Sequence, residues 1–588
     1  MPDFFYQIKS ETKEIPMSSK YSLLFPDQSL PYRKLTDLTV HDIGMDSVLL
    51  KLSREKNEQV YISNVMKMVT SDPTNARYRS DVFDDIYKNK AMREELLELL
   101  DKVNFLKEYG SYKHDNDHEP GIWDLVHRLE EINDYIKSIG AIYKCLSNAD
   151  IHSEGLLGLK KYVEGLYEDN GFEELKKDIS ELKADTSCLK SVTVGINLNE
   201  RFEASGVGLI SVNSRPFSKS NLVSHFMDKV SGKDIINESS DWDGDYKFDE
   251  IQAKGPLQNG ADFVPPVFSP MAMMSIMKVS EADDQTKEIT NYMDKITDRM
   301  LSQTVKHLRN VLNKYTMLTV GDITDLIPEF IFYVRWAEYI EKMSDKGAVF
   351  CKPEAFDELK ETENKPLMDA KGVYNIKLLS EHSSAFEDIV RNDLDFTREH
   401  TLYILTGANM GGKTTITQSI GQLYFMAQAG IYVAASSFKY APVDDIFTHF
   451  PADEDKTMDL GRLGEECKRF KELYENATEK SLMLLNETFS TTSFEEGYYI
   501  AKDCSKAILK KGIRTIYNTH MHKLALDISE INDEEVPAKA ASLVVKAKEG
   551  KRLYEVEVAP PVGLSYAKDI AEKYGVTFEM LSASDAHK

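Results

Sequence analysis

Residues 402–415 of the chain read Leu-Tyr-Ile-Leu-Thr-Gly-Ala-Asn-Met-Gly-Gly-Lys-Thr-Thr. The part from Gly407 to Thr414 fits the pattern G-x-x-x-x-G-K-[ST], which is typical of a loop that binds nucleotide phosphates. The apolar residues 402–405 before it predict a strand, and residues 416–428 after it carry apolar side chains at helical spacing. A strand, a glycine loop and a helix in this order are the geometry that the pattern requires. The alternative, a glycine-rich turn without function, is disfavoured by this context.

In such a loop the backbone N–H groups point at phosphate oxygens, and the lysine adds a positive charge near the β- and γ-phosphates. Lys413 would take that role, and the Thr414 hydroxyl would reach Mg²⁺. We therefore expect ATP and Mg²⁺ as cofactors. The expected nucleotide-binding residues are Gly407, Ala408, Asn409, Met410, Gly411, Gly412, Lys413, Thr414 and Thr415.

A second predicted strand ends in polar residues that would serve the same site. Residues 481–485 are apolar after the first position and are followed by Asn486 and Glu487. In P-loop ATPases such a strand ends with an aspartate that orients Mg²⁺, and a glutamate beside it can act as general base. Asn486 occupies the aspartate position and offers only a neutral carbonyl, so Mg²⁺ should be held less firmly. Glu487 is the expected base.

A third predicted strand, residues 514–517, runs into Asn518-Thr519-His520. His520 could hydrogen-bond the γ-phosphate or the attacking water. Taken alone, a histidine here is more often structural, and the strand before Glu487 could be an ordinary core strand. His522 is expected at the surface. Together the strand ends predict catalytic roles for Lys413, Glu487 and His520, with Thr414 and Asn486 at the metal.

The rest of the chain is predicted to be mainly helical. Residues 1–85 mix short apolar runs with turns, and residues 235–265 are acidic, contain Gly and Pro, and predict a mobile loop. A β-hairpin is predicted between the helices, because residues 191–198 and 206–212 alternate apolar and polar side chains. The predicted helices cover residues 91–109, 121–146, 154–183 with an interruption near 170–171, 280–315 and 320–346.

The predicted fold class is an α/β P-loop ATPase domain of ABC type at the C-terminal end, joined to a mostly α-helical region with a small β insert. A β insert between long helices favours an extended arm with a tip, but a compact helical domain with an irregular insert fits equally well. The predicted domains are 1–85 (mixed), 86–188 (helical), 189–275 (β-containing insert and acidic loop), 276–392 (returning helices and transition) and 393–588 (ATPase).

Bulk properties limit the class of protein. At 588 residues the chain has the length of about three to five domains. Its apolar runs are too short for a transmembrane helix, and its first residues lack the layout of a signal peptide. The five cysteines are far apart, so we expect reduced thiols and a cytoplasmic location. A net charge of −25 argues against a nucleic-acid coat or a membrane-surface protein, although one face could still bind nucleic acid.

With the three motifs in place, the chain resembles the MutS family of DNA mismatch-repair ATPases. Residues 406–415 are similar to that family's Thr-Gly-Pro-Asn-Met-Gly-Gly-Lys-Ser-Thr, with Ala408 in place of proline. The segment 476–482 resembles the approach to its second strand, and Thr519-His520 resembles its Thr-His pair. Further matches are residues 563–567, which resemble its Ser-Tyr-Gly segment, and residues 77–82, which look like the start of its core domain.

The resemblance is strong over residues 393–578 and weaker over the helical region. It implies that the helices form a core and a lever, and that the β-hairpin is a clamp that touches DNA. It also implies a dimer in which a signature loop of the partner completes each P-loop. We therefore expect a homodimer through the ATPase domain, DNA as a partner and no membrane.

Several positions depart from the family's pattern. The front of the chain is too short for the mismatch-reading and connector domains, residues 4–7 lack the Phe-x-Glu that wedges into a mismatch, and no nuclease domain is expected. After Glu487, the family's Ile-Gly-Arg-Gly becomes Thr488-Phe489-Ser490-Thr491. The signature loop, Ser-Gly-Arg-Ser-Thr in the family, aligns with residues 458–462. The candidates for the contact with the partner's γ-phosphate are therefore Gly461, Arg462 and Gly464.

Two functions stay open at this point. The first is a MutS-like ATPase that binds DNA as a dimeric clamp, on branched or other non-mismatch structures. The second is a nucleotide-gated structural or interaction module with little hydrolysis and a protein or RNA partner. The acidic charge and Asn486 favour the second function, whereas the family resemblance favours the first, which we prefer.

Overall fold

The computed structural model describes residues 21–26, 32–110, 122–168, 170–186, 191–198, 200, 204–213, 235–238, 246–247, 302–312, 326–358, 366–381, 386–407, 411–451, 461–532, 538–548, 551–561, 572 and 574–585. By its internal contacts the chain divides into two compact units. The second unit contains Glu98–Lys144 and Lys161–Thr324. The first unit, which holds the predicted nucleotide site, contains Met1–Leu97, Cys145–Lys160 and Asp325–Lys588.

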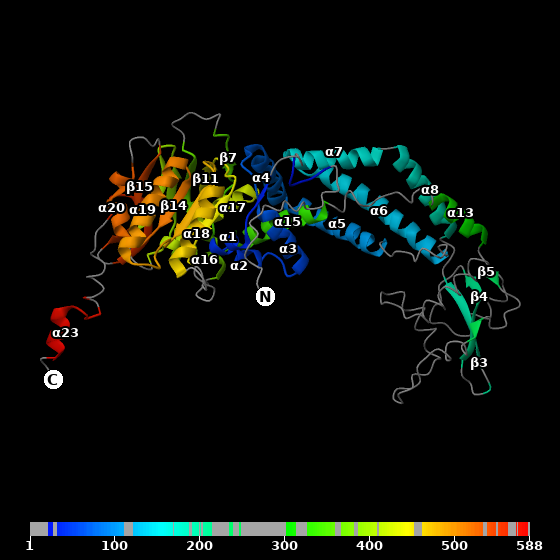
Figure 1. The fold of residues 1–588 in the computed structure, drawn as a ribbon. Helices are drawn as coiled ribbons and strands as arrows, with labels where there is room; N and C mark the ends of the chain where they lie inside the picture. The colour runs from blue at the N-terminus through cyan, green and yellow to red at the C-terminus, as the bar shows by residue number, and fades with distance from the viewer. Residues whose placement is uncertain are drawn as a thin grey trace. The chain divides into compact units, whose positions relative to one another are not determined.

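A six-stranded sheet is the main sheet of the first unit (Figure 1). Its strand order is β12-β13-β14-β10-β15-β16, and all neighbours are parallel except β15 and β16. Parallel neighbours place the carboxyl ends of β10, β13 and β14 at the same edge of the sheet. The strands are β10 (His400–Thr406), β12 (Ile446–His449), β13 (Leu482–Asn486), β14 (Arg514–Asn518), β15 (Lys539–Lys548) and β16 (Lys551–Val558).

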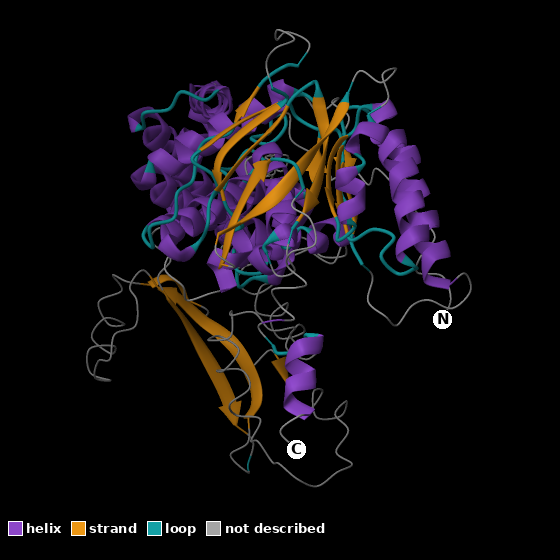
Figure 2. Ribbon diagram, turned by 90° about the vertical axis from the view of Figure 1, so that its left-hand side faces the viewer, coloured by secondary structure: helices purple, strands orange, loops and turns teal. Residues whose placement is uncertain are grey.

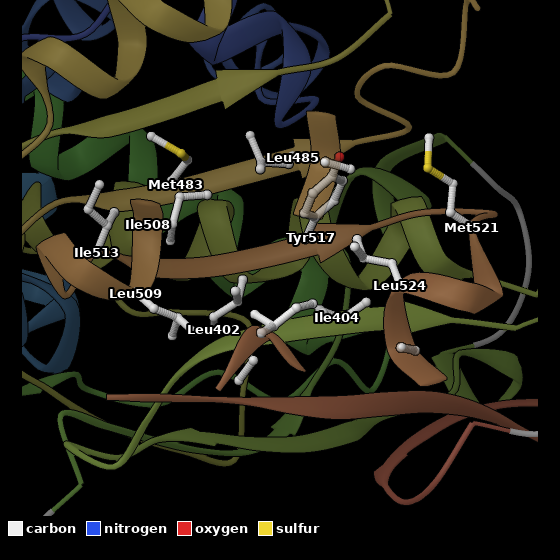
Figure 3. Packing of buried hydrophobic residues seen from close by; sticks show 14 of the residues in the cluster. Leu402, Ile404, Met483, Leu485, Ile508, Leu509, Ile513, Tyr517, Met521 and Leu524 are labelled. Atoms are coloured by element: carbon white, nitrogen blue, oxygen red, sulfur yellow. The ribbon is translucent and has the colours of Figure 1, made fainter. Parts of the chain in front are cut away.

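Helices cover both faces of this sheet (Figure 2). On one face α17 contacts β13 and β14, and a Cβ at Gly421 would lie 2.8 Å from Leu484, so glycine permits the close approach. Because side chains alternate along a strand, Met483 and Leu485 point to the other face. There they belong to one buried cluster with Ile508 of α19 (Figure 3). The helices are α17 (Lys413–Gln428), α18 (Gly461–Asn476), α19 (Phe494–Lys511), α20 (His522–Leu526) and α21 (Ile528–Ile531).

A smaller four-stranded sheet in the first unit has the order β7-β11-β8-β9. Strand β8 pairs with β11, which follows α17 in sequence, so the segment expected as a transition is built into the nucleotide-binding part of the unit. The elements of this region are β7 (Glu354–Ala355), β8 (Met368–Val373), α16 (Ile376–Glu381), the 3₁₀ helix η3 (Phe386–Asp388), β9 (Asn392–Phe396) and β11 (Ser437–Tyr440); α23 (Phe578–Asp585) is the last described helix.

The prediction that residues 1–85 mix short apolar runs with turns is wrong for the described part of that segment, which is mainly helical. Asp72 caps α4 by accepting from the Thr74 N–H, and Pro73 occupies the first turn, where proline is tolerated. The buried face of α4 includes Asn75 and Arg79, so polar residues hide its apolar periodicity. The elements are β1 (Arg33–Lys34), α1 (Asp37–Asp42), α2 (Asp46–Leu49), α3 (Lys56–Met66), β2 (Met68–Val69), α4 (Pro73–Lys88) and, later in the chain, α15 (Ile327–Ser344).

The second unit contains long helices and a β-sheet of order β3-β4-β5, with β6 paired to β4. The predicted hairpin is confirmed: β3 (Ser191–Leu198) pairs antiparallel with β4 (Ala204–Asn213). The prediction of a loop over 235–265 is wrong for β5 (Ile235–Glu238) and β6 (Tyr246–Lys247), and the rest of that range lies outside the described residues. Helices that contribute to this unit are α5 (Lys90–Gly110), α6 (Ile122–Asn148), α7 (Glu154–Glu168), α8 (Asn170–Thr186) and α13 (Ser302–Leu312).

The predicted helix over 280–315 is described only as α13, because residues 280–301 and 313–315 lie outside the described part of the chain. None of the described helices is long and apolar enough to cross a membrane.

A buried carboxylate joins residues near the N-terminus to α15. Glu329 accepts from the Ser22 hydroxyl at 2.9 Å and from the Leu23 N–H at 2.6 Å, and only 7% of it is exposed. Burial raises the pKa of Glu329 from 4.5 to about 7, although these two hydrogen bonds oppose the shift. At a pH between these two pKa values, the folded state therefore holds a proton that the unfolded state has released. The stability that comes from the protonated carboxyl group is complete below the unfolded pKa and is lost as the pH rises through the folded pKa.

We predict that the free energy of unfolding of Glu329→Gln rises by about 3 kcal/mol relative to that of the wild type when the pH rises from about 5 to about 8. The glutamine side chain is not charged at either pH, whereas the wild-type carboxylate must ionise in a buried site. Urea unfolding followed by tryptophan fluorescence measures the difference, since Trp336 is fully buried on the same helix. An equal difference between the two proteins at both pH values would contradict the assignment.

Candidate nucleotide-binding site

The glycine loop connects β10 to α17, as the sequence predicts. Gly407 has a φ of +147°, and a Cβ there would lie 2.9 Å from the Cβ of Val545. Gly412 has a φ of +88° and caps the first turn of α17 in a left-handed conformation. Both positions therefore require glycine, for space and for backbone conformation. Ala408, Asn409 and Met410 lie outside the described residues.

Lys413 is the first residue of α17 and is buried, with 5% of its surface exposed. Its Nζ donates to the Gly407 carbonyl oxygen at 3.1 Å, across the mouth of the loop. Burial lowers the pKa of Lys413, and the charge of Glu487 opposes that shift. The lysine is thus held in the position from which it could reach a phosphate in the loop.

The ends of β13 and β14 meet the start of α17 through hydrogen bonds. The Thr414 hydroxyl donates to the Asn486 Oδ1 at 3.1 Å, so the structure brings the two predicted metal residues together. The Asn518 amide donates to the Thr414 Oγ1 at 3.3 Å and also to the Asn486 Oδ1. Asn486 and Asn518 are 7% and 0% exposed, so this group of neutral side chains is enclosed.

Glu487 and His520 form a pair at the edge of the same site. The His520 Nε2 lies 2.6 Å from the Glu487 Oε1, and the two side chains are 40% exposed for His520 and 32% for Glu487. Both residues also line the cavity described below. His522 was expected at the surface, but it is half-buried, and burial lowers its pKa. It is the first residue of α20, and three residues separate it from the end of β14 at Asn518.

A cavity of about 600 Å³ extends from the glycine loop along α17. One part contains Gly411, Gly412, Lys413, Thr414 and Glu487. The other part has more apolar side chains. It is lined by Val373, Tyr374, Asn375, Leu378, Ile389, Val390, Ile416 and Tyr554, and the remaining lining residues are Asp388, Asn392, Thr415, Ser419 and His520.

Three parts of this site were not predicted from the sequence. Asn518 could have been found, because it follows an apolar strand in the same way as Asn486. The segment 373–392 gave no such signal, since it reaches the site through β8 and α16, far from the glycine loop in sequence. Tyr554 also gave none: it lies on β16, and its Cδ1 would be 3.3 Å from a Cβ at Gly412.

The predicted partner contacts lie at the start of another helix. Gly461 and Arg462 begin α18, and Gly464 follows in its first turn. Among the described residues that line the cavity, none belongs to this turn.

The oxygen atoms at the strand ends fit a hard divalent cation. The Thr414 hydroxyl and the Asn486 carbonyl are side by side, and Mg²⁺ prefers oxygen ligands and retains several of its waters. Asn518 faces these two oxygens with its amide nitrogen, which donates to both. Fold and site together define a P-loop nucleotide-binding protein.

Comparisons with known protein families agree with this class of protein and identify the family. The model for MutS domain V matches residues 403–586, and the model for the MutS2 N-terminal domain matches residues 71–346. The chain is a member of the MutS family, and its C-terminal segment is the ATPase domain of that family. The resemblance noted from the motifs is confirmed, and the N-terminal match adds a relation to MutS2.

Individual relatives match only parts of their length. Endonuclease MutS2 of Thermus thermophilus is 28% identical over 199 residues, which cover 34% of this chain and 26% of the relative. Endonuclease MutS2 of Caldicellulosiruptor bescii is 26% identical over 277 residues, 47% of this chain and 34% of the relative. DNA mismatch repair protein MutS of Chlorobium chlorochromatii is 37% identical over 142 residues, 24% of this chain and 16% of the relative. The chain thus spans about a third or less of the relatives it matches.

The loop after Glu487 adopts a strained backbone. Glu487 and Phe489 have φ values of +53° and +65°, in the left-handed region that favours glycine. The family's pattern has glycine, which tolerates positive φ, at the position of Phe489. Phe489 is 1% exposed, and its ring lies 5.5 Å from that of Phe470 on α18. Aromatic packing thus offsets the backbone strain.

We predict that Phe489→Gly is more stable than Phe489→Ala, by about 1 kcal/mol. Both variants lose the buried ring, and both should be less stable than the wild type by about 3 kcal/mol or more. Only alanine keeps the unfavourable contact of Cβ with the backbone at positive φ. The comparison of the two variants by urea unfolding isolates this strain. The usual order, with alanine more stable than glycine, would show that the backbone at 489 is relaxed.

Proposed function

We propose that the chain binds ATP with Mg²⁺ and hydrolyses it in the cavity beside α17. The observation that carries the proposal is the convergence of Lys413, Thr414, Glu487 and His520 on one cavity that also has room for the nucleoside. The phosphates would lie against the loop amides and the start of α17, where the helix dipole favours negative charge. The nucleoside would lie in the apolar part, near Tyr374 and Ile389.

Each polar group then has a role in phosphoryl transfer. Lys413 would exchange the Gly407 carbonyl for the β- and γ-phosphates and stabilise their charge. Glu487 would accept a proton from the attacking water, and His520 would hold its carboxylate in place and face the γ-phosphate. Thr414 and Asn486 would hold Mg²⁺, which neutralises phosphate charge when bound.

We predict that Glu487→Gln lowers the rate of ATP hydrolysis by about 10²–10⁴-fold while ATP binding is retained. The amide cannot accept the proton from water, but it has the same size as the carboxylate. Phosphate release measures the rate, and fluorescence of N-methylanthraniloyl-ATP measures binding. Glu495→Gln is the matched control, because Glu495 is exposed in the first turn of α19. Equal rates in Glu487→Gln and the wild type would contradict the role of the base.

DNA is the proposed partner of the chain, bound by a homodimer that acts as a clamp. The MutS2-like helical region and the β-sheet of the second unit support this proposal, as do the mismatch-repair and endonuclease names of the relatives. In the dimer, Gly461, Arg462 and Gly464 would reach the γ-phosphate of the partner. We propose branched DNA rather than mismatches as the preferred structure.

A second candidate is a nucleotide-gated module with little hydrolysis and a protein or RNA partner. Two observations favour it: the Glu487 carboxylate is already engaged by His520, and the metal site lacks a carboxylate at Asn486. Both would slow hydrolysis without preventing nucleotide binding.

We predict that the full chain binds a four-way DNA junction more tightly than it binds plain or mismatched duplex, and that ATP changes this affinity. Fluorescence anisotropy with labelled DNAs at low and moderate salt provides the measurement, and the affinity should fall as salt rises because phosphate contacts release counterions. RNA of the same length is the comparison. Absence of binding to every DNA at low salt would contradict the DNA proposal, and preferential binding of RNA would support the second candidate.

A further inference from the structure

Thr488 directly follows Glu487, and hydrogen bonds hold both its side chain and its carbonyl group. Its hydroxyl lies 3.1 Å from the His449 Nδ1 and 3.3 Å from the His449 carbonyl oxygen. Its own carbonyl oxygen accepts from the Tyr517 hydroxyl at 3.1 Å. Thr488, His449 and Tyr517 are all buried, so these hydrogen bonds are shielded from solvent.

The histidine acts as the acceptor in its hydrogen bond with Thr488. Burial lowers the pKa of His449 to about 3, so the ring is neutral and carries one proton. Its Nε2 lies 3.3 Å from the Glu466 carbonyl oxygen, which can only accept, so the proton is on Nε2. The Thr488 hydroxyl therefore donates to Nδ1, a buried acceptor that would otherwise be unsatisfied.

The backbone on both sides of Thr488 is strained. Glu487 and Phe489 have φ values of +53° and +65°, and side chains other than glycine disfavour this region. Such strain persists where the surrounding contacts over-determine the conformation, and it is often found at functional sites. The Glu487 N–H donates to the Asn518 carbonyl oxygen at 2.8 Å, which holds the start of the turn, and the contacts of Thr488 hold its middle.

We propose that Thr488 is a positioning residue: its hydrogen bond to His449 holds the turn that places Glu487 against the attacking water. The inference rests on the proposed function, because it requires Glu487 to act as the base. Glu487 lines the cavity, whereas Thr488 is not among the described residues that line it, so Thr488 would act through its neighbour. The family's pattern has isoleucine at this position, and isoleucine has no hydroxyl to donate.

The expected effect is a loss of rate without a loss of nucleotide binding. Thr488→Val keeps the branched shape and removes the hydroxyl. It should lower kcat for ATP hydrolysis by about 10- to 100-fold, because a displacement of about 1 Å at a reacting group can cost about 10²-fold. The affinity for N-methylanthraniloyl-ATP should be unchanged, because the phosphates would contact the glycine loop and Lys413. Thr488→Ser keeps the hydroxyl and should restore most of the rate.

The matched control is Thr515→Val. Thr515 is also buried, and its hydroxyl donates to the Ile513 carbonyl oxygen at 3.1 Å near the start of β14, at the opposite end of the strand from Asn518. This variant loses a buried threonine hydroxyl from the same sheet and should hydrolyse ATP at the wild-type rate.

A double variant distinguishes positioning of the base from a general loss of folded protein. Glu487→Gln has no base to position, so the addition of Thr488→Val should not lower its residual single-turnover rate any further. A structural defect would instead lower the rate by the same factor in both backgrounds. Tyr517→Phe keeps the buried ring and removes the hydrogen bond to the Thr488 carbonyl, so it tests the same turn if Thr488→Val does not fold.

The outcomes separate the inference from the proposed function. A wild-type rate in folded Thr488→Val, or in Tyr517→Phe where the valine variant does not fold, would overturn the inference, while hydrolysis through Glu487 would stand. The same loss of rate from Thr488→Val in both backgrounds would also overturn it. Equal rates in Glu487→Gln and the wild type would contradict the proposed function, and the inference with it.

Discussion

The register of three parallel strands is the constraint on which the site depends. β14 lies between β13 and β10, so Asn518 is held beside Asn486 and beside the residue that precedes Thr406. This places two amide side chains against the Thr414 hydroxyl at the start of α17. A shift of one residue would turn these side chains to the opposite face. The buried cluster that includes Met483, Leu485 and Tyr517 opposes such a shift, because those residues would then leave the core (Figure 3).

A second constraint acts on the loop that carries Glu487. The Thr488 hydroxyl lies 3.1 Å from His449 Nδ1, and the Tyr517 hydroxyl donates to the Thr488 carbonyl at 3.1 Å. Burial lowers the pKa of His449 to about 3, so this histidine is neutral. Its Nε2 donates to the Glu466 carbonyl oxygen, which leaves Nδ1 to accept from the Thr488 hydroxyl. Phe489 packs on α18, so the loop that carries Glu487 is held by side-chain contacts, whereas the family's pattern has a glycine-rich loop here. The Thr491 hydroxyl also donates to Glu466 of α18, so a second contact connects this loop to the helix.

Local patterns predicted the parts of the structure that depend on neighbours in sequence. The strand, loop and helix around Lys413, and the polar strand ends at Asn486 and His520, were all evident from short segments. The helices between 37 and 88 were missed because buried polar residues such as Arg79 interrupt their apolar periodicity. Tyr554 and the segment 373–392 were missed for another reason: only sheet pairing and the packing of α16 bring them to the cavity. Asn518 was available to the same reasoning that found Asn486.

The central claim is that ATP binds in the cavity beside α17 with its phosphates in the glycine loop. A crystal structure of the full chain with a non-hydrolysable ATP analogue and Mg²⁺ tests it most directly. The account predicts that Lys413 Nζ leaves the Gly407 carbonyl and contacts the phosphates. It also predicts that the adenine ring of the nucleotide lies near Tyr374 and Ile389, and that Thr414 faces the metal. A nucleotide bound elsewhere, or a bound nucleotide with Lys413 still on Gly407, would contradict the account.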